Sequence, residues 1–230
     1  MRFKSIAVQP IAQFITQSIN RDAQNAPHLQ ERILFANIAK AQQTKFGKEH
    51  NFAHIRTYAD YKRQVPLRDY EQLKPYFDLL IQGKADVLWP QKPLYFAKTS
   101  GTTSGTKYIP ITRDSISNHF NSARNALFAY IAETRKSQFF DGKMIFLSGS
   151  PELTRTAGIH TGRLSGIVNH HIPQWLRSNQ LPTYTTNCIE DWEEKLTKIV
   201  EETINQDMRL ISGIPPWTQM YFDRLTEQSG

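Results

Sequence analysis

The stretch YFAKTSGTTSGTKYIPIT, residues 95–112, decides how the rest of the chain is interpreted. Together with Leu94, its first four residues form the short apolar and aromatic run LYFAK, residues 94–98, which predicts a β-strand. Six of the next eight residues, 99–106, carry a hydroxyl group, and the other two are glycines. A second extended segment follows at residues 107–111, and Pro110 restricts it to an edge strand or a strand end. The stretch therefore predicts a polar loop that connects two short strands.

Such a loop suits a phosphate or polyphosphate. Glycine allows the backbone to adopt positive φ and to approach a ligand closely. Consecutive N–H groups can surround an anion, and Lys107 adds a positive charge directly after the loop. The spacing differs from a Walker A loop, which has four residues between its glycines and a lysine directly after the second. The alternative without a binding function is a flexible linker, but linkers seldom lie between core elements.

The residues around this loop predict an α/β fold. Residues 1–90 carry mostly helical patterns, with a helix start at Asn25 and a helix end at Gly83. Strands and helices alternate through residues 91–230, which is typical of a largely parallel sheet with flanking helices. Residues 150–187 have weak periodicity, so short helices and loops are expected there.

Composition excludes several classes of function. The 230 residues carry a formal net charge of +7, but the basic residues are scattered, so a nucleic-acid surface is not indicated. No window approaches the roughly 20 apolar residues of a membrane span, and the N-terminus does not form a convincing signal peptide. Cys188 is the single cysteine, which excludes an intrachain disulfide. We therefore expect a cytoplasmic protein that binds neither nucleic acid nor membrane.

Three further features allow two interpretations each. Cys188 precedes a helical pattern, where a helix N-terminus could lower its thiol pKa, but a partly buried, inert thiol is the simpler interpretation. The turn SGSPE, residues 148–152, follows a predicted strand and could line a cleft, or could be a simple turn. The histidines His160, His170 and His171 lack cysteine or carboxylate partners at ligand spacing, so no metal site is predicted.

The segment TSGTTSGTKYIP, residues 99–110, resembles the phosphate-binding signature of the adenylate-forming superfamily, although Ser104 is an extra residue and the proline before Lys107 is missing. The flanking segments narrow the resemblance. The segments YIPIT, GRLSGI, DWEEKLTKIVEETINQD and ISGIPPW are similar to bacterial members of the auxin-responsive-promoter family, the acyl-acid amido synthetases. The resemblance covers nearly the whole chain.

Enzymes of this family use ATP and Mg²⁺ to convert a carboxylic acid to an acyl-adenylate, and an amine such as an amino acid then takes the acyl group. The resemblance implies that a loop over the ATP phosphates is formed by Thr99, Ser100, Gly101, Thr102, Thr103, Ser104 and Gly105, with Lys107 neutralising charge. On the long helix predicted after Thr112, His119 or Arg124 could meet the carboxylate of the acid, and surface positions for both are the alternative. The catalytic residues are not identified.

The later motifs of the family do not occur in residues 1–230: an adenine-stacking segment with an acidic Mg²⁺ ligand, a ribose-binding aspartate and a mobile small domain. We therefore expect the chain to be the N-terminal portion of the large domain, a fragment not active alone. A different phosphate-loop nucleotide-binding protein and a non-catalytic interaction module are the rival hypotheses. ATP–pyrophosphate exchange separates them, because only adenylating enzymes catalyse it.

Overall fold

A computed structural model describes residues 3–99 and 105–229 of the chain. Five α-helices precede the first strand: α1 (Phe3–Gln24), α2 (Ala26–Ala41), α3 (Lys45–Glu49), α4 (Tyr58–Gln64) and α5 (Tyr70–Ile81), with a 3₁₀ helix η1 (Phe52–His54). The later helices are α6 (Ile116–Thr134), η2 (Gln138–Asp141), α7 (Leu164–Asn169), α8 (Gln174–Arg177), α9 (Tyr184–Cys188), α10 (Trp192–Thr203) and α11 (Pro215–Ser229). The strands are β1 (Tyr95–Lys98), β2 (Tyr108–Ile111), β3 (Lys143–Phe146), β4 (Thr154–Thr156), β5 (Ile159–Arg163), β6 (Gln180–Leu181) and β7 (Met208–Ser212).

Contacts divide the chain into two compact units. The first unit comprises Met1–Gln17, His119–Leu153 and Arg163–Gly230, and the second comprises Ser18–Asn118 and Thr154–Gly162. Because each unit draws on distant parts of the sequence, the division does not fall at residue 90, where the mostly helical sequence patterns end. The assignment of the chain to the large domain of an adenylate-forming enzyme stays a prediction.

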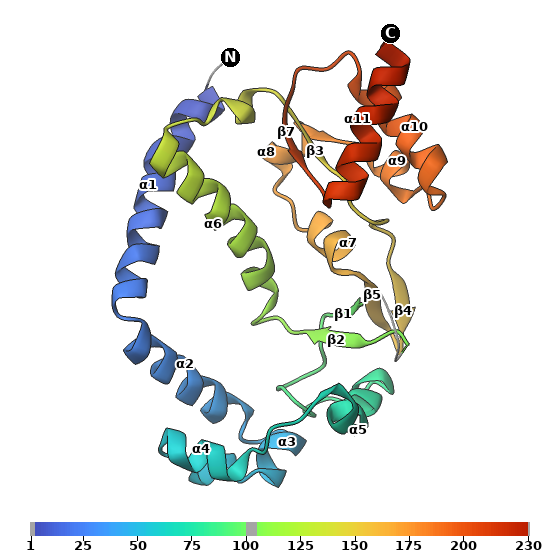
Figure 1. Cartoon of the computed structure of the whole chain (residues 1–230). Helices are drawn as coiled ribbons and strands as arrows, with labels where there is room; N and C mark the ends of the chain where they lie inside the picture. Colours follow the sequence, from blue (N-terminus) through green and yellow to red (C-terminus); the bar gives the residue numbers. More distant parts are fainter. Residues whose placement is uncertain (1–2, 100–104, 230) are drawn as a thin grey trace. The chain divides into compact units, whose positions relative to one another are not determined.

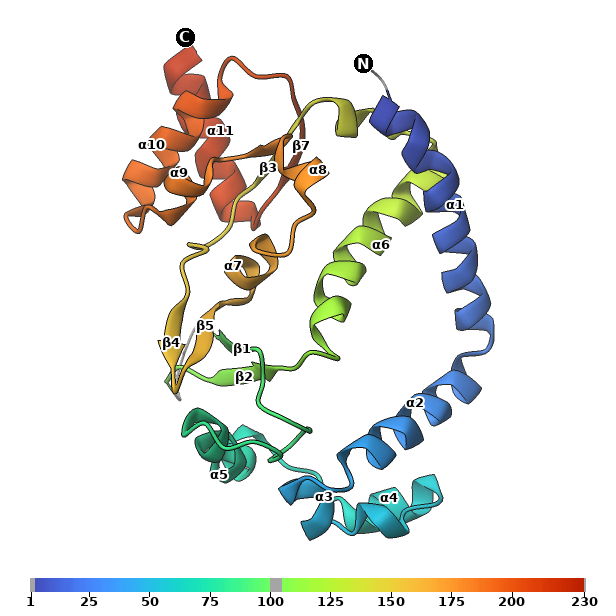
Figure 2. The same ribbon diagram turned by 180° about the vertical axis from the view of Figure 1, so that it is seen from behind.

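The first unit contains a three-stranded sheet in the order β6-β3-β7, and β3 pairs in parallel with both neighbours. Alternate residues of β3 point to opposite faces, as the pleat of a strand requires. Met144 packs with residues of α1 and α6 in one buried cluster, whereas Ile145 packs with residues of α10 and α11 in another. Figure 2 shows α10 and α11 lying together beside this sheet. The predicted α/β class and parallel sheet are confirmed here.

The second unit contains a four-stranded sheet in the order β2-β1-β5-β4 (Figure 1). The pairs β1–β2 and β4–β5 are antiparallel. Strand β2 is an edge strand, as Pro110 predicts, because proline cannot donate a ladder hydrogen bond. Helix α5 packs against this sheet through a cluster that joins Phe77 and Leu80 to Phe96 of β1.

The expectation of only short helices and loops in residues 150–187 was wrong, because β4, β5 and β6 lie there. Strands β4 and β5 form a hairpin in which Thr156 pairs with Ile159. The two residues between them, Ala157 and Gly158, have φ values of 49° and 81°. Two central residues with positive φ match the twist of a two-residue hairpin turn. Alanine rarely adopts this conformation. In the Ala-Gly pair, therefore, only the glycine matches the residues that usually predict a two-residue hairpin turn.

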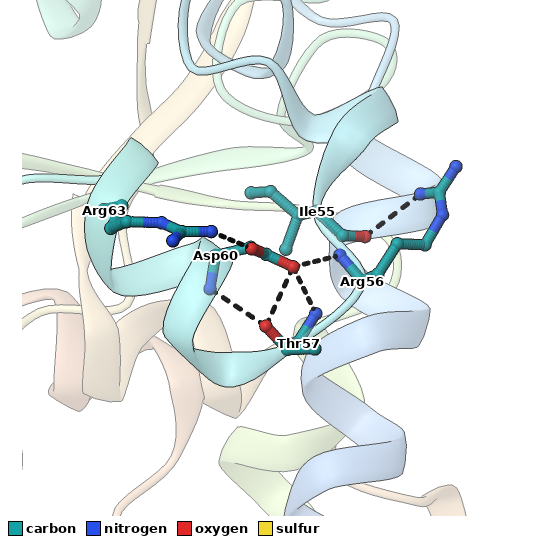
Figure 3. A network of polar contacts seen from close by, with 5 residues as sticks. All are labelled: Ile55, Arg56, Thr57, Asp60 and Arg63. Atoms are coloured by element: carbon teal, nitrogen blue, oxygen red, sulfur yellow. Dashed lines mark hydrogen bonds and ion pairs between the residues drawn. The ribbon is translucent and has the colours of Figure 1, made fainter.

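Local capping sets the bounds of the shorter helices. Helix α5 ends at Ile81 with Gln82 as its C-cap, and the next residue, Gly83, has a φ of +82°, the left-handed conformation typical of a residue after a helix. Helix α4 begins with a reciprocal capping box between Thr57 and Asp60. Thr57 Oγ1 accepts a hydrogen bond from the Asp60 N–H at 3.1 Å, and Asp60 Oδ2 accepts one from the Thr57 N–H at 2.9 Å (Figure 3). Asp60 also accepts from the Arg56 N–H and pairs with Arg63.

Replacing Thr57 with alanine is expected to lower the free energy of unfolding by about 1 kcal/mol, because the Asp60 N–H loses its acceptor at the N-terminus of α4. Thr57→Ser keeps the hydroxyl and is expected to stay within a few tenths of a kcal/mol of the original chain. Urea unfolding of the two variants checks this difference. Equal losses would show that the methyl group, and not the cap, stabilises the helix.

The capping box also carries a pH dependence. The hydrogen bond from the Thr57 side chain, followed by those from the Arg56 and Thr57 backbone N–H groups, lowers the pKa of Asp60 below its ordinary value. A lowered folded-state pKa means that the contribution is complete above the unfolded pKa and is lost as pH falls through the folded one. The stability gap between the original chain and Asp60→Ala should therefore shrink on acidification below about pH 4. A gap that stays constant down to pH 2 would contradict this.

None of the helices in the described part of the chain combines the length and apolar character needed to cross a membrane.

Candidate functional site

The hydroxyl-rich stretch closes the hairpin between β1 and β2. Lys98, the last residue of β1, pairs with Tyr108, the first residue of β2. Beyond them, the Thr99 N–H donates to the Lys107 carbonyl at 3.1 Å, which extends the pairing by one step. The predicted strand–loop–strand arrangement is therefore confirmed. Residues Ser100, Gly101, Thr102, Thr103 and Ser104 of the predicted phosphate loop lie outside the described residues.

The described ends of the loop leave backbone exposed. Thr99, Gly105 and Thr106 are all exposed. Gly105 has a φ of +79°, and among the described residues no atom lies within 4 Å of a Cβ added there. A left-handed residue without a side chain, in open space, leaves its backbone accessible to a ligand. The geometry of Gly105 therefore fits the close approach of a phosphate that the sequence predicts.

Lys107 is held at the base of the loop by Tyr70, the first residue of α5. The Lys107 ammonium lies 4.9 Å from the centroid of the Tyr70 ring, within the range of a cation–π contact. The Tyr70 hydroxyl accepts a hydrogen bond from the Tyr108 N–H at 3.1 Å. The ring stacks on Phe77 at a centroid distance of 4.8 Å, which fixes its plane. One aromatic residue thus joins the lysine, the second strand and the helix.

Tyr70 is the residue that sequence reasoning missed at this site. It precedes Lys107 by 37 positions, and its role depends on how α5 packs against the hairpin. The only local signal is its place at the start of α5, where Asp69 forms a capping box with Gln72. A capped helix start fixes the backbone of its first residue, but it does not tell which strand that residue will contact.

The predicted acid-binding residues lie on α6, and the described contacts give neither a specific role. His119 is half-buried and Arg124 is exposed. The Arg124 guanidinium donates to the Asn125 side chain at 3.2 Å and 2.9 Å and lies 5.9 Å from the centroid of the Phe128 ring. Their assignment to an acid substrate stays a prediction.

The argument that placed Cys188 at a helix N-terminus was wrong. Cys188 is the last residue of α9, and α10 begins at Trp192 after its N-cap Asp191. The thiol is free and half-buried, and it forms a hydrogen bond with the Tyr184 side chain. This hydrogen bond is the main cause of the raised pKa of Tyr184. A position at the C-terminal end of a helix removes the reason to consider Cys188 a nucleophile.

Within the described residues, no three His, Cys, Asp or Glu side chains gather in a way that could hold a metal ion. The three histidines have other contacts. His160 Nε2 lies 3.4 Å from the Arg155 guanidinium, His170 Nε2 donates to the Pro151 carbonyl at 2.8 Å, and His171 stacks on Phe120 at 5.4 Å. Burial is the main reason that the pKa of His171 lies below its ordinary value.

Comparisons with known proteins match the chain to one family and to solved structures of similar fold. The sequence model of the GH3 family N-terminal domain matches residues 15–197, which include the whole β1–β2 hairpin. Among curated proteins, none matches the sequence.

The solved structures that are similar in fold include two acyl acid amido synthetases. A GH3.15 acyl acid amido synthetase superposes with a TM-score of 0.73 at 16% identity over 90% of this chain. AtGH3.15 acyl acid amido synthetase in complex with 2,4-DB superposes with a TM-score of 0.73 at 17% identity over 93% of this chain. In both cases the chain spans 38% of the length of the matched protein.

Proposed function

Because the chain belongs to the GH3 family through its N-terminal domain, we propose that it is part of an ATP-dependent acyl acid amido synthetase. The observation that carries this proposal is the β1–β2 hairpin, whose hydroxyl-rich loop lies inside the range that the family matches. The chain spans 38% of the similar solved proteins, so the activity is proposed for the complete gene product.

The proposed reaction has two steps. A carboxylate oxygen attacks the α-phosphorus of ATP, the bond between this phosphorus and the oxygen that bridges to the β-phosphorus breaks, and acyl-adenylate and pyrophosphate form. The amine of a second substrate, such as an amino acid, then attacks the acyl carbon, loses a proton and releases AMP to give the amide. The first step is needed because a free carboxylate is a poor electrophile, whereas AMP is a good leaving group.

The hairpin is proposed to hold the β- and γ-phosphates of ATP. Backbone N–H groups and hydroxyls of residues 99–105 would donate to phosphate oxygens, and Lys107 would offset their charge. The open left-handed Gly105 and the tethered Lys107 support this role. Mg²⁺ is proposed to enter with ATP as part of the substrate complex, and no described residue is assigned to it.

The acid is proposed to be a small-molecule carboxylic acid, since a GH3.15 relative is named as a complex with 2,4-DB. His119 and Arg124 of α6 are proposed to lie near its carboxylate, because a cation and an imidazole are suitable partners for an anion. The cytoplasm is the proposed compartment, since a chain with a single cysteine gains nothing from an oxidising one.

ATP–pyrophosphate exchange by the complete gene product tests the proposal. Labelled pyrophosphate should enter ATP in a reaction that requires a carboxylic acid, because the first step is reversible. Amide formation then requires the amine as well. ATP hydrolysis without any acid-dependent exchange would contradict the ligase assignment and would favour a different nucleotide-binding function.

A further inference from the structure

A second polar loop lies at the carboxyl end of the parallel sheet in the first unit. The turn Ser148–Glu152 follows β3, which is the middle strand of the order β6-β3-β7. The chain passes from β3 to β6 on one side and then returns to β7 on the other. In open α/β sheets, ligands bind outside the carboxyl ends of the strands at the point where the strand order reverses. The turn after β3 occupies that point.

The backbone of this turn has free donors. The Leu147 N–H still donates to the Ser212 carbonyl of β7 at 2.8 Å. No described residue accepts a hydrogen bond from the backbone N–H of the next three residues, Ser148, Gly149 and Ser150. Three successive donors without a protein partner are suited to an anion or to water.

Two side chains and one close backbone contact hold the turn in place. The Lys195 ammonium of α10 donates to the Ser148 carbonyl at 3.1 Å and to the Asn187 carbonyl at 2.6 Å. His170 donates to the Pro151 carbonyl at 2.8 Å. A Cβ at Gly166 would lie 2.7 Å from the Ser150 carbonyl oxygen, so α7 packs closely against the turn. Every carbonyl that these groups contact is fixed, whereas the N–H groups of residues 148–150 stay free.

Two cations lie against the turn, which itself ends at the exposed carboxylate of Glu152. The Arg163 side chain lies directly on Gly149, where an added Cβ would be 2.6 Å from its Cδ and 3.1 Å from its Nη1. Lys195 is only 3% exposed, and burial lowers its pKa to about 8, which leaves it largely charged at pH 7. Among the described residues, no carboxylate forms an ion pair with either cation. Two cations without a carboxylate partner favour an anionic ligand.

We propose that the N–H groups of Ser148–Ser150 and the Arg163 guanidinium form a binding site for the carboxylate of a small molecule, with Lys195 as the positioning residue of the turn. The planar guanidinium fork matches a carboxylate in a bidentate contact. The proposed reaction has two carboxylate-bearing substrates, the acid and an amino acid, and this choice of ligand source rests on the proposed function. The existence of the site does not rest on the proposed function, because carboxylate binding can be measured without ATP.

NMR titration of the ¹⁵N-labelled 230-residue chain with benzoate, and separately with glycine, tests the site. The amide signals of Ser148, Gly149 and Ser150 should move with at least one probe. Arg163→Met should weaken that binding roughly tenfold, since hydrogen bonds to a charged group are lost. Arg224→Met is the matched control in the same unit, because Arg224 already pairs with Glu193. It should leave the affinity unchanged.

Gly149→Ala provides a second variant that does not remove a charge. The added methyl group must displace the flexible Arg163 side chain, so binding should weaken while the guanidinium is still present. If benzoate and glycine leave the three amides unmoved, or if inorganic phosphate moves them as strongly, the carboxylate site is wrong. Loss of binding in Arg224→Met equal to that in Arg163→Met would also overturn it. Absent pyrophosphate exchange with intact benzoate binding would contradict the proposed function alone.

Discussion

Replacing Lys107 with methionine in the complete gene product is expected to lower ATP–pyrophosphate exchange by about a hundredfold or more. The proposed role of Lys107 is to offset the charge of the leaving pyrophosphate, and methionine keeps the length of the side chain without the charge. The fold should survive, because Lys107 is only half-buried and its described side-chain contact is the face of Tyr70. Unfolding free energy should fall by no more than about 1 kcal/mol.

Lys62 provides the matched control. Its ammonium lies 5.8 Å from the centroid of the Tyr58 ring, so Lys62→Met removes a cation and a cation–π contact from α4 in the same unit. Exchange should be unchanged in this variant. Lys107→Arg should restore part of the activity, because the charge returns with a different geometry. If Lys107→Met and Lys62→Met lose the same small amount of activity, the lysine has no part in phosphate binding.

Replacing Phe96 with alanine is expected to lower the free energy of unfolding by about 3–5 kcal/mol. The Phe96 side chain is 0% exposed in the centre of β1 and packs edge-on against Tyr108 of β2 at a centroid distance of 6.1 Å. It also joins the sheet to α5 in one buried cluster. The deletion would leave a cavity between the hairpin and the helix that carries Tyr70.

Ile109→Ala in β2 is the control for this prediction. Ile109 pairs with Ala97 across the same hairpin, but its side chain is 41% exposed. Its loss should cost less than about 1.5 kcal/mol. Urea unfolding measures both variants, and similar losses would show that the hairpin is not anchored through the Phe96 cluster.

The elements that the sequence predicts well carry their own local signals. Helix α4 has Thr57 and Asp60 at capping positions, and β2 has Pro110 at a position that only an edge strand tolerates. The β4–β5 hairpin has only half of such a signal: Gly158 is a usual turn residue, but Ala157 occupies a left-handed position that usually belongs to glycine or asparagine. The pairing of these short strands then depends on their place in the sheet, and the local sequence does not predict that place.

The candidate site divides along the same line. The composition of the loop and the position of Lys107 can be predicted from the sequence, because both are features of one continuous segment. The roles of Tyr70 and Arg163 cannot be predicted in this way. Each depends on a contact with a residue distant in the sequence: Tyr70 with Lys107, and Arg163 with Gly149. Tertiary packing determines such contacts, and the residues next to Tyr70 and Arg163 in the sequence do not predict them.

The central claim is that the β1–β2 hairpin holds the phosphates of ATP, and NMR titration of the labelled chain with Mg²⁺–ATP tests it most directly. The amide signals of Thr99, Gly105, Thr106 and Lys107 should move with ATP and with pyrophosphate, but not with adenosine. These shifts should be lost in Lys107→Met and retained in Lys62→Met. Equal shifts with adenosine, or ATP-dependent shifts that leave these four residues unmoved, would contradict the account.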